Sequence, residues 1–297
     1  MIYLESFRLA TEQDETTYLV ADPERRSAKL DMSCMDTNNA YPFKIFPFKY
    51  LDWLEFSTIT LLYGGNGSGK STILNIIAQK LKLNRTSPFN HAICFEDYLT
   101  FCRAGLAKGK NPPEGSCIIT SDDVFDFMLN FRALNEGVDR KREELIDEWR
   151  ALREEGFQMK SLEDFEELQH RREAWSSTRS AYVSRRLPKN LPGQSNGENA
   201  YGYFAEKIRG NALYLLDEPE NSLSAERQME LARFIEDSAR FYGCQFIIST
   251  HSPFLLAMKG AMIYDLDSIP VEQKKWTELS NVRLYHDFFE AHRKEFD

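Results

Sequence analysis

The chain has 297 residues, of which 42% are hydrophobic and 28% are charged. This composition excludes a fibrous or wholly disordered protein, and the length allows one large domain or two. The formal net charge of −9 excludes a surface that is basic overall, so nucleic acid would need a local patch. Two clusters are candidates, although a solvated helix face explains such clusters more often: Lys80, Lys82 and Arg85, and Arg185, Arg186 and Lys189.

Cysteine spacing and the absence of sorting signals bear on the compartment. The five cysteines are scattered and form no C-x-x-C pair, which predicts reduced structural thiols rather than a zinc or redox site. The N-terminus lacks a secretory apolar segment, and no apolar run approaches the roughly 20 residues that span a bilayer. We therefore expect a cytoplasmic protein without a membrane segment.

The first 62 residues alternate short apolar runs with turn residues, which predicts a β-rich start. The expected strands are Ile2–Leu4, Tyr18–Val20, Phe43–Phe46, Leu54–Phe56 and Ile59–Leu62. After Ser71 the apolar residues recur at helical spacing. This spacing predicts a helix with one buried stripe that ends near Asn84.

Residues 123–190 combine helical periodicity with many charges, which predicts a separate helical lobe. We expect Gly137 and Gly156 to break this lobe into short helices. The sustained heptads of a long coiled coil are absent. The chain therefore divides into a core of residues 1–122 and 191–297 and an inserted helical lobe of residues 123–190.

Two apolar runs, 212–216 and 245–249, flank a helix-like stretch at 225–242. Apolar runs on both sides of a helix are typical of a βαβ unit whose parallel strands are covered on both faces. A last strand at 261–264 and a C-terminal helix carrying Val282, Tyr285, Phe288 and Phe289 follow. The pattern predicts an α/β fold with a mostly parallel sheet.

A glycine-rich motif follows the strand at 59–62 and fits G-x-x-x-x-G-K-[ST]. Its glycines let backbone N–H groups surround phosphates, and the next helix adds its positive dipole end. We expect Lys70 to bridge β- and γ-phosphate oxygens and Ser71 to bind Mg²⁺. A chance glycine-rich turn is the alternative. The residues of the motif are Gly64, Gly65, Asn66, Gly67, Ser68, Gly69, Lys70, Ser71 and Thr72.

Polar residues end both strands of the βαβ unit. Asp217 and Glu218 follow the first strand, and His251 follows the second. Both residues lie at the edge of the sheet where parallel strands bind ligands. We expect Asp217 to bind Mg²⁺ there, and Glu218 to act as a general base or to position the water that attacks the γ-phosphate. We expect His251 to act as a sensor of the γ-phosphate or to form a hydrogen bond with it in the transition state. If Glu218 is not the base, Glu220 and His251 are the next candidates. An acidic loop that caps the following helix is the alternative.

This set of motifs resembles the ATP-binding-cassette ATPases, and among them the SMC-like, RecF-like and OLD-like branch. In the resemblance, Gly64 to Ser71 is Walker A, Leu213 to Glu218 is Walker B, Asn221 to Ser224 is the D-loop and His251 is the H-loop. The strings around Ser121, Asp217 and His251 also resemble a bacterial group of small predicted AAA/ABC ATPases. Ser6-Phe7-Arg8 is similar to an N-F-R element of SMC-like heads, with Ser6 in place of Asn.

The resemblance implies a signature motif at Ser195, Asn196, Gly197 and Glu198, in an S-x-G-E form. It further implies a head-to-tail homodimer in which Ser195, Gly197 and Glu198 face the partner's ATP. The family's Q-loop falls at Ile119 to Asp122, which has no glutamine, so Ser121 or Asp122 would supply the contact to metal or water. The adenine-stacking aromatic is left open among five residues: Phe43, Phe46, Phe48, Tyr50 and Trp53.

Two functions of different classes follow. The first is a Mg²⁺-dependent ATPase that converts ATP and water to ADP and phosphate and drives a conformational or clamping cycle, with DNA repair and phage defence as settings. The second is an ATP-gated module that binds DNA or a partner protein and turns over slowly. A transporter subunit is disfavoured, because the signature is not L-S-G-G-Q and no membrane segment is present.

Overall fold

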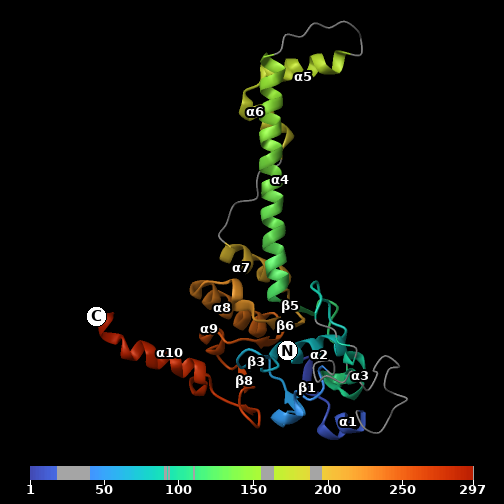
Figure 1. Cartoon of the computed structure of the whole chain (residues 1–297), viewed down its shortest axis with the longest axis vertical. Coiled ribbons are helices and arrows are strands. Elements are labelled where there is room, and N and C mark those ends of the chain that lie inside the picture. Colours follow the sequence, from blue (N-terminus) through green and yellow to red (C-terminus); the bar gives the residue numbers. More distant parts are fainter. Residues whose placement is uncertain are drawn as a thin grey trace, which may run out of the picture. The chain divides into compact units, whose positions relative to one another are not determined.

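A computed structural model describes residues 1–18, 41–89, 92, 94–109, 111–154, 164–187 and 196–296. The chain folds as two compact units, one of residues 1–125 and 196–297 and the other of residues 126–195 (Figure 1). These limits differ by a few residues from the division drawn from the sequence.

The first unit is built on a six-stranded sheet in the order β5-β6-β7-β3-β8-β9, in which only β9 is antiparallel to its neighbour. The three central strands, β6, β7 and β3, are almost completely buried, as expected for parallel strands covered on both faces. The sheet confirms the α/β fold class. The strands are β5 (Cys117–Thr120), β6 (Leu213–Asp217), β7 (Gln245–Ser249), β3 (Ile59–Tyr63), β8 (Met262–Asp265) and β9 (Glu272–Gln273).

A smaller antiparallel sheet in the order β2-β1-β4 forms the β-rich N-terminal part, with β2 (Trp53–Glu55), β1 (Leu4–Arg8) and β4 (Arg103–Leu106). The strand expected at Phe43–Phe46 is wrong, because these residues form turns before the 3₁₀ helix η3 (Pro47–Lys49). Phe43 and Phe46 are nevertheless buried in the core. In the strand expected at Tyr18–Val20, Tyr18 belongs to a helical segment, and residues 19 and 20 lie outside the described residues.

Two helices of the first unit, α2 and α8, pack against strands of the six-stranded sheet. The stripe predicted after Ser71 is present, since Ile73, Leu74, Ile76 and Ile77 of α2 are fully buried. The helix α8 begins after Ser224, whose hydroxyl accepts from the Arg227 N–H at 3.4 Å. The helices are α1 (Glu12–Thr16), α2 (Lys70–Leu81), α3 (Phe95–Phe101), α7 (Asn196–Lys207), α8 (Ala225–Phe241), α9 (Pro253–Leu256) and α10 (Ser280–Ala291), with the 3₁₀ turns η4 (Ala107–Gly109), η6 (Pro219–Ser222), η7 (Trp276–Glu278) and η8 (Arg293–Glu295).

The second unit is helical and has a small core of its own. It contains most of α4 (Ser121–Glu154) with α5 (Phe165–Ser176) and α6 (Arg179–Arg186), and Leu145, Ala174, Tyr182 and Val183 are buried between them. The expected break at Gly137 is wrong, because Gly137 lies inside α4, which is continuous over its 34 residues. One glycine costs a helix only about 1 kcal/mol, which neighbouring turns of a long helix offset. Gly156 lies outside the described residues.

Among the described residues, no helix is both long enough and apolar enough to span a bilayer.

Candidate nucleotide-binding site

The glycine-rich motif forms a loop between β3 and α2, in the strand, turn and helix order that phosphate binding requires. Gly67 and Gly69 have φ angles of 79° and 101°, in the left-handed region that glycine enters without steric cost. The helix α2 begins at Lys70, directly after Gly69. Its first N–H groups therefore face the loop, where an anion would be stabilised by the helix dipole.

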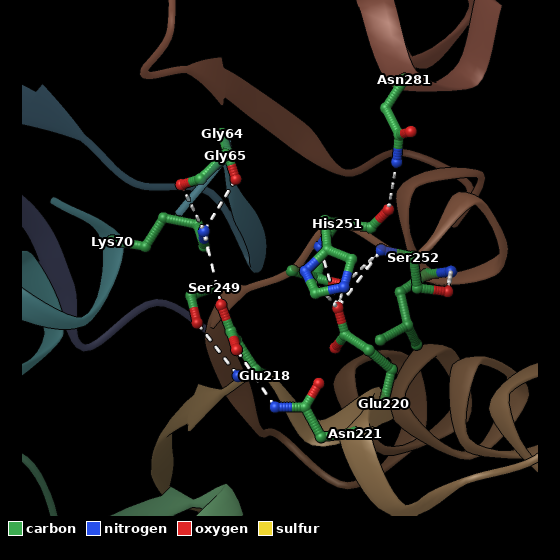
Figure 2. A network of polar contacts seen from close by, with 12 residues as sticks. Gly64, Gly65, Lys70, Glu218, Glu220, Asn221, Ser249, His251, Ser252 and Asn281 are labelled. Atoms are coloured by element: carbon green, nitrogen blue, oxygen red, sulfur yellow. Dashed lines mark hydrogen bonds and ion pairs between the residues drawn. The ribbon is translucent and has the colours of Figure 1, made fainter. Parts of the chain in front are cut away.

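Lys70 lies almost buried beneath this loop, with 3% of its side chain exposed. Its Nζ donates to the carbonyl oxygens of Gly64 at 2.7 Å and Gly65 at 3.0 Å, and lies 3.4 Å from Oε1 of Glu218 (Figure 2). The ammonium group is thus positioned between the phosphate-binding loop and the end of β6.

Ser71 and Asp217 meet at the same edge of the sheet. The Ser71 hydroxyl donates to Oδ1 of Asp217 at 2.9 Å, and the Ser249 hydroxyl donates to the same oxygen. Burial raises the pKa of Asp217, and the hydrogen bonds from Ser249 and Ser71 oppose that rise. Neighbouring hydroxyl and carboxylate oxygens are the ligands that Mg²⁺ prefers, so Ser71 and Asp217 fit this ion.

Ser121 and Asp122 line the same cavity as Ser71 and Asp217, a space of about 790 Å³. They reach it because β5 lies beside β6, with Thr120 opposite Asp217, and α4 begins at Ser121. The cavity also contains Arg85, which is held by Oδ1 of Asn75 at 3.1 Å. Both residues expected in place of the missing glutamine, Ser121 and Asp122, therefore lie close enough to Ser71 and Asp217 to line one cavity with them.

Glu218 has an unusual backbone conformation, with φ 48° and ψ 55° in the left-handed region. Its N–H donates to the carbonyl oxygen of Ser249 at 3.1 Å and to the Ser249 hydroxyl at 3.0 Å. Its Oε2 accepts from Nδ2 of Asn221 at 3.1 Å. These contacts hold the carboxylate between Lys70 and the turn η6, against the strain of the backbone.

His251 is positioned through Glu220, which is 5% exposed. Oε1 of Glu220 accepts from the Thr250 hydroxyl at 2.7 Å, from the His251 N–H at 2.8 Å and from the Ser252 N–H at 3.2 Å, and it lies 3.5 Å from Nδ1 of His251 (Figure 2). Nδ2 of Asn281, at the start of α10, donates to the His251 carbonyl oxygen at 3.1 Å. With the His251 ring 45% exposed, the imidazole is accessible while its backbone is fixed on two sides.

The signature residues are described only in part. Ser195 lies outside the described residues, and α7 begins at Asn196, so that Gly197 and Glu198 belong to its first turn. The position of the Glu198 side chain is likewise outside what the structure describes.

Among the adenine-stacking candidates, Phe43 and Phe46 are buried, whereas Phe48, Tyr50 and Trp53 are exposed.

Three hydrogen bonds of the site were not predicted from the sequence. The Ser249 hydroxyl donates to Asp217, Glu220 accepts from the His251 N–H, and Asn281 donates to the His251 carbonyl oxygen. The only available signal was that Ser249 ends a strand, as Asp217 does. Members of both candidate basic clusters make contacts within the protein: Lys80 donates to the Leu99 carbonyl oxygen, and Arg186 donates to Glu173. Lys189 lies outside the described residues.

A mostly parallel α/β sheet, a glycine-rich loop leading from β3 into α2, and an Asp-Glu pair at the end of β6 together define a P-loop NTPase fold. Residues 184–257 match the profile of a family described as an AAA domain, putative AbiEii toxin, type IV TA system. That stretch contains Asp217, Glu218 and His251 and does not contain the P-loop. No curated protein sequence matches the chain.

Solved structures resemble the chain at low identity. An SMC head domain with an extended coiled coil from Pyrococcus furiosus, bound to the C-terminal domain of ScpA, is 13% identical, with 99% of this chain and 100% of that chain covered and a TM-score of 0.41. A dimeric ATP-binding cassette bound to ADP and Pi is 15% identical, with 76% and 90% covered and a TM-score of 0.36. The SMC head domain from Thermotoga maritima is 15% identical, with 72% and 88% covered and a TM-score of 0.31.

Proposed function

We propose that the protein binds ATP with Mg²⁺ and hydrolyses it to ADP and phosphate. The observation that carries this proposal is the convergence of four side chains where β3 and β6 end. Ser71 Oγ lies 2.9 Å from Asp217 Oδ1, and Lys70 Nζ lies 3.4 Å from Glu218 Oε1. Transfer of the γ-phosphoryl group to water depends mainly on positioning of the reactants and on stabilisation of the charge on the phosphate oxygens. These four side chains supply both.

Each side chain has a distinct task. Lys70 and the loop N–H groups neutralise the β- and γ-phosphates, while Ser71 and Asp217 hold Mg²⁺. When bound there, Mg²⁺ would supply positive charge against the negative charge that develops on the phosphate oxygens. Glu218 orients the attacking water and accepts its proton. His251, with its backbone fixed by Glu220 and Asn281, donates a hydrogen bond to the γ-phosphate as charge develops.

The test is Glu218→Gln, which keeps the shape of the side chain and removes its basicity. We expect ATP binding to be retained and hydrolysis to fall by about a hundredfold or more. The matched control is Glu226→Gln, which changes an exposed carboxylate in the first turn of α8. Hydrolysis at the wild-type rate in Glu218→Gln would move the base elsewhere and overturn this assignment.

We further propose that ATP closes two copies head to tail, with Ser195, Gly197 and Glu198 of one copy facing the nucleotide of the other. The start of α7 at Asn196 supports this, because free N–H groups at a helix N-terminus bind anions. Ser195→Arg should block closure while Lys70, Ser71 and Asp217 still bind ATP.

Mixing Ser195→Arg with Lys70→Ala tests whether the site is shared. A mixed dimer would regain one intact site, formed by the P-loop of the Ser195→Arg copy and the signature of the Lys70→Ala copy. Partial recovery of hydrolysis is expected. Its absence, with mixed dimers shown to form by light scattering or crosslinking, would rule out a shared site.

The helical second unit, with its separate core, favours a cycle in which ATP moves a binding surface. We propose that its load is DNA or a partner protein. Hydrolysis measured with and without linear and closed circular DNA discriminates the two hypotheses: strong stimulation supports an ATP-gated clamp, and an unchanged rate supports an ATPase that acts without DNA.

A further inference from the structure

A second cavity, of about 690 Å³, is lined in part by His251, and no residue of the P-loop is among the described residues that line it. One wall is a face of α10, where Val282, Tyr285, His286 and Phe289 recur at helical spacing. Phe254 and Trp276 also line the cavity, which adds two aromatic side chains to those of Tyr285 and Phe289. Its volume is within the range of small-molecule sites, which are usually apolar with a few polar groups.

Among the described residues that line this cavity, the acidic group is the carboxylate of Glu220. Its two oxygens differ sharply. Oε1 accepts three hydrogen bonds, from Thr250, His251 and Ser252. Oε2 is buried and, among the described residues, has no hydrogen-bond partner. A buried carboxylate oxygen without a donor is costly, and a ligand that brings a donor removes that cost.

From these observations we infer that the cavity binds a small organic cation, an amine or guanidinium attached to an aromatic or aliphatic body. The cationic group donates to Oε2 of Glu220, and the body packs against Phe254, Trp276 and Phe289. A charged donor on a carboxylate is stronger than a neutral one, and aromatic faces attract cations. Arg283 and His286 also line the cavity, but both are exposed on α10, whereas Glu220 is buried.

The position of the cavity couples it to the nucleotide site, a consequence that rests on the proposed function. Glu220 holds the backbone N–H of His251, and Asn281 of α10 holds its carbonyl oxygen (Figure 2). A cation that binds Glu220 and also contacts α10 therefore contacts both elements that hydrogen-bond to the His251 backbone. Occupancy is expected to change the rate of hydrolysis rather than the affinity for ATP.

The binding experiment uses the full chain without nucleotide, so that it succeeds or fails independently of ATP hydrolysis. The probe is 2-phenylethylamine, compared by calorimetry with the neutral 2-phenylethanol and the anionic 3-phenylpropionate. For a ligand of this size we expect a Kd on the order of 0.1–1 mM for the amine. The amine should bind about tenfold or more tightly than the alcohol. No saturable binding, or equal binding of all three probes, overturns the proposal.

Variants locate the site. Glu220→Gln should abolish the preference for the amine over the alcohol. Because this change also touches the support of His251, Phe289→Ala is the second variant, and it should weaken amine binding by about tenfold through lost packing. Phe288→Ala is the matched control, since Phe288 lies beside Phe289 with similar exposure, 56% against 53%, and does not line the cavity. Equal losses in Phe288→Ala and Phe289→Ala would place the binding elsewhere and overturn the assignment.

Discussion

Lys70 and Glu218 form an ion pair in this structure, with Nζ 3.4 Å from Oε1. The cation expected to bind phosphate and the carboxylate expected to act as base are therefore in contact with each other. A γ-phosphate bound at Lys70 would compete with Glu218 for the ammonium group. Binding of ATP is thus expected to release the carboxylate toward water, which links substrate binding to activation of the base.

Lys70→Ala should remove nucleotide binding or hydrolysis. The lost ammonium group leaves the β- and γ-phosphate charge uncompensated, which is worth about 3 kcal/mol or more in the transition state. Fluorescent-nucleotide binding and phosphate release measure the two steps. Lys141→Ala is the control, because Lys141 is an exposed partner of Glu144 in the second unit. Near-normal turnover in Lys70→Ala would remove this residue from the mechanism.

Glu218→Gly should be more stable than Glu218→Ala, although both variants should be inactive. The φ of 48° at this position favours glycine, whereas an L side chain in the left-handed region costs about 1–2 kcal/mol. The greater unfolded-state entropy of glycine offsets part of this, so the expected difference is about 1 kcal/mol. Urea denaturation measures it. At Glu226, inside α8, the order should reverse, with Ala more stable than Gly.

The arrangement of the candidate site was largely predictable because its residues lie at the ends of strands or just after them. The loop after β3, Asp217 at the end of β6 and His251 after β7 all lie at one edge, since parallel strands place their carboxyl ends together. The supporting contacts were not predictable. Ser249 reaches Asp217 only because the register of β6 and β7 sets the two residues side by side, and register cannot be read from one strand.

The errors have physical causes. Phe43–Phe46 has the apolar content of a strand, yet the two phenylalanines are buried from within turns, because burial alone does not fix the backbone. Gly137 is a weak helix former, and its local preference was outweighed by the length of α4. Local propensity is a prior that packing and cooperativity override.

Glu15 should make the protein less stable as the pH rises from about 4.5 to 7. Burial raises the pKa of its carboxyl from 4.5 to about 7, the N–H of Lys44 opposes the shift, and Asp14 and Glu12 add to it. Because the folded pKa is the higher one, the group costs nothing below pH 4.5 and its full penalty, about 3 kcal/mol, above pH 7.

Glu15→Gln tests this through the pH profile of stability. Between pH 4.5 and 8, the free energy of unfolding should fall by about 3 kcal/mol less in the variant than in the wild type. A pH-independent cost of the amide does not change this difference. Denaturant midpoints at several pH values measure the difference. Glu5→Gln, at an exposed position of β1, should follow the wild-type profile. Parallel profiles for wild type and Glu15→Gln would show that Glu15 titrates normally.

Gly137→Ala should stabilise α4 by about 1 kcal/mol, because alanine has the higher helix propensity and a smaller loss of backbone entropy. The position is exposed inside the helix, and a Cβ there would meet no atom within 4 Å. Gly67→Ala is the contrasting change, since a Cβ at Gly67 also meets no atom within 4 Å, but its φ of 79° strains any L side chain. Gly67→Ala should therefore cost about 1–2 kcal/mol and weaken nucleotide binding. Helical ellipticity followed through urea denaturation gives both values. A destabilised Gly137→Ala would mean that α4 requires a deformable point at this residue, because neither space nor backbone angle opposes the alanine.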